Sequence, residues 1–145
     1  MNAQLADTLS VPNGHGEKIL IVDDEPCILE AAKRVLESWG YQPVLAEDGV
    51  SAIALYAQQP DEIDLVLTDL VMPLMDGLML IRAVRKLNPE QKIILSTGRD
   101  EDLQSPEIRS LGVDACLMKP HSREKLLMTL EETLHCNRTA AAVAS

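Results

Sequence analysis

Short apolar runs alternate with longer stretches of helical periodicity five times along this sequence. The runs cover residues 19–22, 43–46, 63–68, 92–96 and 115–118. The first of them, at 19–22, is apolar throughout and stops at two aspartates, which is typical of a strand covered on both faces. Strict alternation of strands and helices favours a parallel sheet with right-handed crossovers. We therefore expect an α/β fold, a doubly wound five-stranded parallel sheet with helices on both faces.

Start and stop signals mark the stretches between these runs as helices. Pro26 suits the first turn of one helix, and Gly40 suits its left-handed end. The later helices follow side chains that can accept a hydrogen bond from a first-turn N–H group, namely Asp48, Asp76, Ser105 and Ser122. The residues between Gly98 and Ser105 are predicted to form a polar loop.

The length and composition favour one domain. The chain has 145 residues, of which 46% are hydrophobic and 25% charged, as in a single globular domain with a core. We expect this domain to span residues 18–136. Residues 1–17 show no periodicity and predict a flexible N-terminal segment, and residues 137–145 predict a flexible tail. Because so few residues follow the last expected helix, output is expected to pass through contacts with other proteins.

The charge balance excludes several classes of partner. The chain has 23 Asp and Glu against 13 Lys and Arg, a formal net charge of −10 at pH 7, and its aromatic residues are one Trp and two Tyr. A chain so poor in cations and aromatic rings is not expected to bind nucleic acid directly. No apolar run approaches the roughly 18 residues of a membrane helix, and no Lys or Arg precedes residue 17 to begin a signal peptide. We expect no membrane association and a cytoplasmic location.

The three cysteines do not form a recognisable pattern. Cys27, Cys116 and Cys136 are odd in number, far apart and in no C-x-x-C arrangement. This spacing predicts neither a disulfide framework nor a zinc site. We expect buried or inert thiols.

Polar side chains that could together form a site follow four of the five predicted strands. Asp23 and Asp24 follow the first strand, Asp69 the third, Thr97 the fourth and Lys119 the fifth. In a doubly wound sheet the ligand site lies beyond the carboxyl ends of the strands, so these side chains are expected to converge. Two carboxylates about 4 Å apart repel by about 4 kcal/mol at an effective dielectric constant near 20. Three of them therefore predict a divalent cation, for which Mg2+ is the natural candidate and Mn2+ a second.

The same set of residues favours phosphoryl transfer. A carboxylate flanked by a metal ion, an ammonium group and a hydroxyl group can act as the nucleophile, because catalysis of this reaction consists mostly of positioning and charge neutralisation. Asp69 follows the third strand, which we expect to be central. Asp23 and Asp24 are adjacent to each other and better placed to hold metal. We therefore predict that Asp69 is the phosphoacceptor.

Four segments together resemble the receiver domain of two-component response regulators, either a stand-alone receiver or one from a hybrid sensor kinase. They are Ile19–Pro26, Leu67–Pro73 followed by Asp76-Gly77, Ile94–Gly98, and Met118–Pro120. The resemblance covers about residues 18–135. It implies a flavodoxin-like sheet of order 2-1-3-4-5 and a phosphorylation-dependent signalling switch that belongs to a two-component phosphorelay. It also implies a cis peptide bond between Lys119 and Pro120.

The resemblance assigns a role to each residue of the set. Asp69 would accept the phosphoryl group from a phosphohistidine. Asp24 would bind Mg2+ directly and Asp23 mainly through water, and the backbone carbonyl group of Val71 would complete the protein ligands. Thr97 and Lys119 would each bind a phosphoryl oxygen, with Thr97 as the moving part of the switch.

The resemblance also implies the partners. The phosphodonor would be a histidine kinase or a histidine phosphotransfer protein, and the signal would pass to a downstream protein by contact, with a phosphorylation-dependent homodimer as a further option. The domain would catalyse only its own phosphorylation and dephosphorylation, so we do not expect an enzyme in the usual sense.

Several positions depart from the pattern of the family. Cys116 stands three residues before Lys119, where Tyr or Phe is usual, so the aromatic part of the switch is absent or relocated. Gly98 stands where Ala is common. Val71 has no side-chain group to bind an attacking water, and Arg99 lies where it can cover the phosphoryl group. From Val71 and Arg99 we predict slow hydrolysis of the aspartyl phosphate.

Three other functions were weighed against this one. A flavodoxin-like electron carrier needs a hydroxyl-containing, Gly-rich loop after the first strand, where this chain has Asp23–Pro26. A phosphatase of the haloacid dehalogenase type needs two aspartates separated by one residue there. The third alternative is a receiver-like interaction module that is never phosphorylated. It stays open until phosphorylation is measured.

Overall fold

The computed structural model describes residues 13–136. Its five-stranded sheet is parallel throughout, with the order β2-β1-β3-β4-β5. The strands are β1 (Lys18–Val22), β2 (Gln42–Ala46), β3 (Leu65–Asp69), β4 (Ile93–Thr97) and β5 (Ala115–Met118). The predicted fold class and strand order are both confirmed. Strands β3 and β4 end one residue later than predicted, which makes Asp69 and Thr97 the last residues of their strands.

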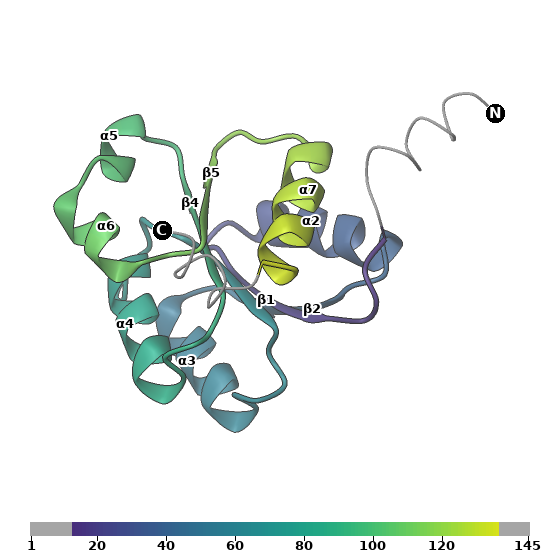
Figure 1. Ribbon diagram of the computed structural model, residues 1–145, viewed down its shortest axis with the longest axis horizontal. Coiled ribbons are helices and arrows are strands. Elements are labelled where there is room, and N and C mark those ends of the chain that lie inside the picture. The colour runs from purple at the N-terminus through teal and green to yellow at the C-terminus, as the bar shows by residue number, and fades with distance from the viewer. Residues whose placement is uncertain (1–12, 137–145) are drawn as a thin grey trace.

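Helices cover both faces of the sheet (Figure 1). They are α2 (Pro26–Ser38), α3 (Gly49–Gln58), α4 (Gly77–Leu87), α5 (Asp100–Leu103), α6 (Pro106–Leu111) and α7 (Arg123–Leu134). The core is divided by the sheet into two clusters. One packs side chains of β1, β3 and β4 against α3, α4 and α6, and the other packs the alternate side chains against α2 and α7. Burial on both faces explains why the sequences of the inner strands β1, β3 and β4 are largely apolar.

Three of the four predicted helix caps are confirmed. The carboxylates of Asp48 and Asp76 and the hydroxyl group of Ser122 each accept a hydrogen bond from an N–H group in the first turn, at 2.7 to 3.0 Å. Ser105 precedes α6 but makes no such bond, so that prediction is wrong. Its N–H group donates to the carbonyl oxygen of Asp102, because α6 follows α5 almost directly. The one-turn helix α5 lies where we predicted a polar loop.

The part of the N-terminal segment that the structure describes is bonded to the domain. The N–H groups of Gly14 and Gly16 donate to the carbonyl oxygens of Trp39 and Gly40, and a Cβ atom at Gly14 would lie 2.6 Å from the ring of Tyr41. The predictions for residues 1–12 and for the tail at 137–145 lie outside the described residues. The domain boundaries therefore stay a prediction.

The expectation of buried thiols is wrong. Cys27, Cys116 and Cys136 are unbridged and exposed. Cys116 lies on the edge strand β5, where Leu117 points into the core between the sheet and α7, so the neighbouring Cys116 points to the opposite, less covered face. Within residues 13–136, no helix combines the length and the apolar character of a membrane span.

Candidate functional site

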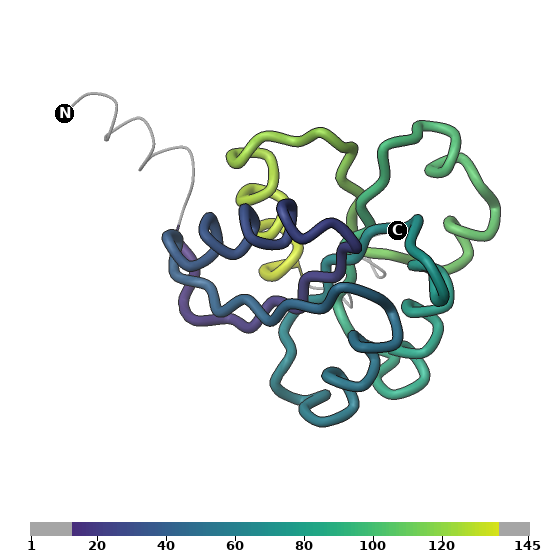
Figure 2. The backbone as a smooth tube through the Cα atoms, turned by 180° about the vertical axis from the view of Figure 1, so that it is seen from behind, coloured from purple at the N-terminus to yellow at the C-terminus, as the bar shows by residue number. Residues whose placement is uncertain are grey.

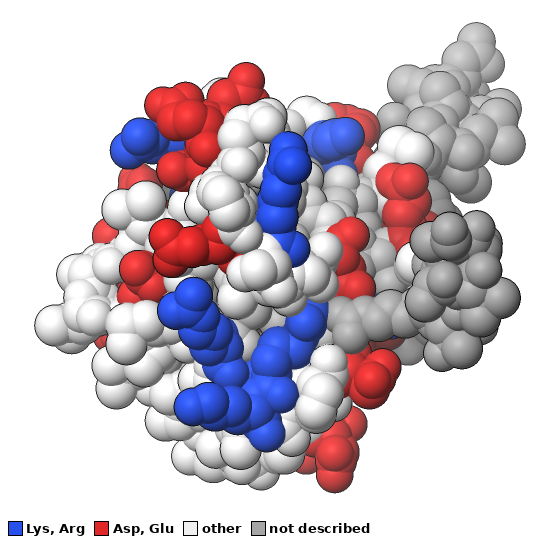
Figure 3. Space-filling view, turned by 60° about the vertical axis from the view of Figure 1, so that its left-hand side comes forward, with Lys and Arg blue, Asp and Glu red and all other residues white. Residues whose placement is uncertain are grey.

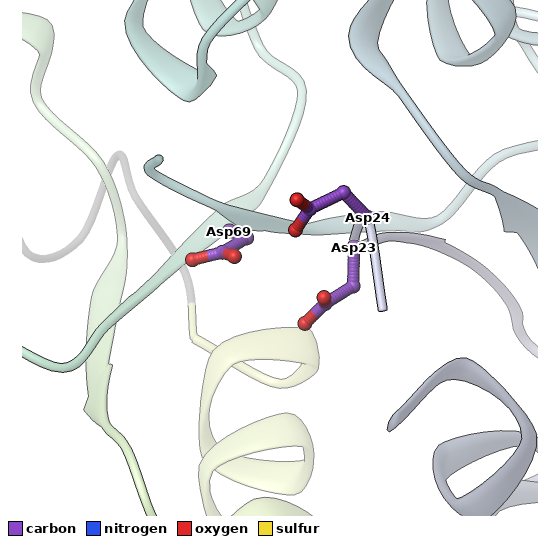
Figure 4. A group of neighbouring side chains, drawn as sticks. All are labelled: Asp23, Asp24 and Asp69. Atoms are coloured by element: carbon purple, nitrogen blue, oxygen red, sulfur yellow. The ribbon is translucent and has the colours of Figure 1, made fainter. Parts of the chain in front are cut away.

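Three carboxylates meet where β1 and β3 end (Figure 4). Asp23, Asp24 and Asp69 each offer one oxygen atom, and these three atoms lie within 4.8 Å of one another. Asp23 and Asp69 are 4% and 9% exposed, whereas Asp24 is exposed. Hard oxygen donors in this number suit Mg2+, which takes a few carboxylate oxygens and keeps several waters. The predicted convergence of the three aspartates is confirmed by their positions, and the cluster fits a divalent cation.

The ammonium group of Lys119 reaches the cluster from β5. Its Nζ atom lies 2.8 Å from Asp23 Oδ2 and 3.2 Å from Asp69 Oδ2. The peptide bond between Lys119 and Pro120 is cis, as expected. Burial alone would lower the pKa of Lys119, but the hydrogen bond to Asp23 and the charges of Asp69 and Asp23 outweigh it and raise this pKa. Lys119 is therefore a fixed positive charge between two carboxylates.

Asp69 lies under opposing influences. Burial raises the pKa of its carboxyl group, against the charge and hydrogen bond of Lys119, which favour the ionised form. The pKa of Asp69 is raised by burial and, to a smaller extent, by the charge of Asp23, whereas that of Lys119 is raised by the two carboxylates beside it, of which Asp23 is the nearer. A divalent cation beside Asp69 would favour its ionised form. Lys119 therefore compensates the negative charge of the Asp69 carboxylate only in part.

The oxygens of Asp23 and Asp24 differ in their availability. Asp23 Oδ2 accepts from Lys119 Nζ, and its Oδ1 accepts from the N–H group of Glu25 at 3.0 Å. Among the described residues, no side-chain hydrogen bond or ion pair of Asp24 is found. Asp24 can therefore offer an oxygen to a cation at little cost, whereas Asp23 already has a protein donor on each oxygen.

The loop after β3 is packed tightly against Asp69. Asp69 Oδ1 accepts from the N–H group of Leu70 at 2.9 Å, and the N–H group of Gly77 donates to the carbonyl oxygen of Leu70 at 2.8 Å. A Cβ atom at Gly77 would lie 2.5 Å from the carbonyl oxygen of Asp69. Only glycine fits at the start of α4 without moving this backbone. Val71 lies in the same loop and is 65% exposed, so it is not packed over Asp69.

Thr97 is brought to the same end of the sheet but is bonded elsewhere. Its hydroxyl group donates to Asp102 Oδ2 in α5 at 2.8 Å. Ser96, the residue before Thr97 in β4, pairs with Asp69, so the side chains of Ser96 and Asp69 lie on the same face of the sheet. Because side chains alternate along a strand, the side chain of Thr97 lies on the opposite face from that of Asp69. The guanidinium group of Arg99 lies 3.5 Å from Glu101 and 3.9 Å from Asp102. Both Thr97 and Arg99 are thus engaged with α5.

Sequence reasoning missed two polar residues here. The sequence places Asp102 in a predicted polar loop, and its contact with Thr97 has no signal there beyond the acidic run. The hydroxyl group of Ser96 is buried without a hydrogen-bond partner among the described residues, beside a cavity of about 30 Å³ that Asp69 and Lys119 also line. An apolar strand pattern gives no reason to single out Ser96.

An apolar groove borders the cluster between α2 and α7. Its volume is about 620 Å³, and its lining includes Ile28, Ala32, Val35, Pro120 and Leu126, with Lys119 at its edge. The carboxylate cluster is therefore flanked on this side by a concave apolar surface.

Comparison with known sequences assigns this arrangement to a family. The pattern of the response regulator receiver domain matches residues 19–131. The sensor kinase CckA of Brucella abortus is 38% identical over 119 residues, which are 80% of this chain and 12% of that protein. The response regulator MprA of Mycobacterium bovis is 33% identical over 128 residues, 88% of this chain and 55% of that protein. The chain thus spans about half the length of MprA and a small part of CckA.

Solved structures agree with this assignment. A CheY-like receiver domain protein from Methanospirillum hungatei has a TM-score of 0.75 at 34% identity, covering 82% of this chain and 94% of that one. The chemotaxis protein CheY4 of Vibrio cholerae has a TM-score of 0.74 at 31% identity, covering 81% and 98%. With its sequence match, its strand order and its three aspartates in agreement, this chain belongs to the response regulator receiver domain family.

Proposed function

We propose that this chain is a phosphorylation switch of a two-component phosphorelay, with Asp69 as the phosphoacceptor. Receiver domains interact with histidine kinases and with downstream effectors, and we assign the phosphodonor here to a histidine kinase or a histidine phosphotransfer protein. The observation that carries the proposal is the position of Asp69, whose Oδ2 lies 3.2 Å from Lys119 Nζ and which shares the cation-binding cluster with Asp23 and Asp24. The signal would then pass to a downstream protein by contact.

In the transfer, an oxygen of Asp69 attacks phosphorus. The bond between phosphorus and the imidazole nitrogen of the donor breaks, its electron pair stays on that nitrogen, and the new bond joins phosphorus to the carboxylate oxygen. The N–H group of Leu70 holds Asp69 Oδ1 and so fixes the orientation of the nucleophile. Lys119 would bind a phosphoryl oxygen while it keeps its bond to Asp23.

The cation would be held by the residues best able to offer oxygens. Asp24 and Asp69 would bind it directly, Asp23 mainly through water, and the backbone carbonyl group of Val71 would complete the set. When bound, Mg2+ would offset the negative charge that the carboxylates and the phosphoryl oxygens bring together.

Intact mass spectrometry tests the proposal. The protein is incubated with acetyl phosphate and Mg2+, beside the variants Asp69→Asn and Asp61→Asn, the latter an exposed carboxylate outside the cluster. Wild type and Asp61→Asn are expected to gain one phosphoryl group, and Asp69→Asn none. If wild type gained none, the alternative of an interaction module that is never phosphorylated would replace this proposal.

A further inference from the structure

The hydroxyl group of Thr97 is held by the one-turn helix α5. Thr97 is 2% exposed, its O–H group donates to Asp102 Oδ2 at 2.8 Å, and its Oγ1 accepts from the N–H group of Arg99 at 3.2 Å. A hydroxyl group has one proton to donate. The bond to Asp102 therefore uses the whole donor capacity of this side chain.

The helix α5 has little else to hold it in place. None of its residues is buried, and Arg99, the residue that precedes it, makes no side-chain cap. The ion pairs of Arg99 with Glu101 and Asp102 are 3.5 and 3.9 Å long, and the guanidinium group is exposed, so both pairs are weak. The bond from Thr97 is short, involves a charged acceptor and is partly shielded from water, which makes it the firmer attachment of α5 to the sheet.

The surroundings of α5 leave room for it to move. A cavity of about 330 Å³ lies beside Asp102, lined also by Leu70, Met72, Leu78, Ser105 and Ile108. A Cβ atom at Gly98, which joins Thr97 to α5, would have no neighbour within 4 Å. Figures 1 and 2 show α5 and α6 at the edge of the molecule, well away from α2 and α7. The face drawn in Figure 3 has acidic side chains gathered at its upper left, where α5 lies.

We propose that Asp102 is a latch that competes with the phosphorylated site for the single proton of the Thr97 hydroxyl group. This inference rests on the proposed function. Before phosphorylation, Asp102 accepts the proton and α5 is attached to the sheet. After phosphorylation of Asp69, the Thr97 side chain turns away from α5 at the strand end, a phosphoryl oxygen accepts the proton, and α5 is released. Because the two acceptors exclude each other, attachment of α5 weakens phosphoryl binding, and phosphoryl binding weakens the attachment by the same factor. Asp102 is thus a positioning residue that acts through Thr97.

A double-mutant cycle separates this role from a general effect of charge. The probe is beryllofluoride with Mg2+, a small mimic of the phosphoryl group, titrated while backbone amide shifts are followed by NMR. The variants are Asp102→Ala, Thr97→Val, the double variant, and Asp100→Ala, which removes the same charge from the same helix. Hydrogen exchange of the α5 amides is measured in each variant without the probe.

The latch predicts that Asp102→Ala lowers the apparent Kd for beryllofluoride about tenfold, the value of a hydrogen bond to a charged group. Asp100→Ala should change it far less, and in the Thr97→Val background Asp102→Ala should have no effect. The α5 amides should exchange faster in Asp102→Ala and in Thr97→Val even without the probe.

An equal effect of Asp100→Ala, an effect that persists without the Thr97 hydroxyl group, or no effect at all would overturn the latch and leave the phosphorylation site standing. If wild type itself bound no beryllofluoride, the proposed function would fail, and the latch with it.

Discussion

The two sides of the sheet differ sharply at the end where the site lies. On the side of α2 and α7, Lys119 bonds two buried carboxylates, and Asp69 ends a strand in which every residue is buried. On the other side, α5 buries none of its residues and α6 buries only Ile108. Chemistry needs groups held in fixed positions, whereas a transmitted change needs a segment of low local stability. The proposed phosphorylation site and the proposed moving segment therefore lie on opposite sides of the sheet.

The sharpest way to break this comparison is to truncate one apolar side chain on each side. Ile94 is fully buried in the cluster under α2 and α7, and Leu103 in α5 is half-buried. We expect Ile94→Ala to lower the free energy of unfolding by about 3 kcal/mol and Leu103→Ala by less than about 1 kcal/mol. Urea denaturation followed by circular dichroism measures both. If Ile94→Ala does not fold, Ile94→Val should still cost about 1 kcal/mol. A loss for Leu103→Ala as large as that for Ile94→Ala, or clearly larger than that for Ile94→Val, would contradict the comparison.

Removing the ammonium group of Lys119 tests whether charge stabilises the carboxylate cluster on the side of α2 and α7. Lys119→Met leaves Asp23 and Asp69 buried beside each other, so we expect a loss of about 2 kcal/mol, because unpaired buried charges are costly. Mg2+ should restore more stability to this variant than to wild type. The exposed Lys86→Met variant serves as the control and should change little. A Lys119→Met protein as stable as wild type, with no larger response to Mg2+, would rule out this account of the cluster.

Ionisation of Asp69 should make the free energy of unfolding depend on pH. Burial raises the pKa of Asp69 above its ordinary value of 3.8, so in the folded protein the proton is held at pH values where the unfolded chain has lost it. Stability contributed by the protonated form is therefore lost as pH rises from 3.8 towards the folded-state pKa. Asp69→Asn has no such ionisation and should therefore be more stable than wild type at pH 7.

The check is urea denaturation of both proteins from acidic to neutral pH. The stability difference should grow with pH and shrink when Mg2+ is added. A difference that is constant across this range would show that ionisation of Asp69 is not its source.

The smallest expected effects concern the lifetime of the phosphoryl group. We predict that Val71→Asn, which adds a group able to bind the attacking water, and Arg99→Glu, which removes a cationic cover, both speed phosphate loss from Asp69 several-fold. The measurement is the decay of the phosphorylated mass after acetyl phosphate is removed. No acceleration in either variant would dispose of the prediction.

The parts of the fold that follow from local pattern could be predicted from the sequence. The apolar runs mark the strands, and the caps at Asp48, Asp76 and Ser122 bond N–H groups three residues further along the chain. Both signals are local, so they locate the strands and the helix starts. The convergence of Asp23, Asp24 and Asp69 followed from the rule that parallel strands end at one edge. The lateral order of the strands came from the resemblance to a family, because no local pattern encodes which strands are neighbours.

The features that were missed depend on packing across the sheet. Whether Cys116 is buried depends on what covers one face of the edge strand β5, and the strand's own sequence does not reveal this. The bond between Thr97 and Asp102 depends on a one-turn helix that brings a carboxylate back over the strand end. A short polar stretch has no periodicity from which such a turn could be predicted.

The most direct test of the central claim is to locate the modified residue. The protein is treated with acetyl phosphate, with Mg2+ or with a chelator, and then reduced with borohydride, which converts an aspartyl phosphate into homoserine. Peptide mass spectrometry should find homoserine at position 69 only when Mg2+ is present. Homoserine at another aspartate, or the same yield at position 69 without a divalent cation, would contradict the claim that this carboxylate cluster is a cation-dependent phosphoacceptor.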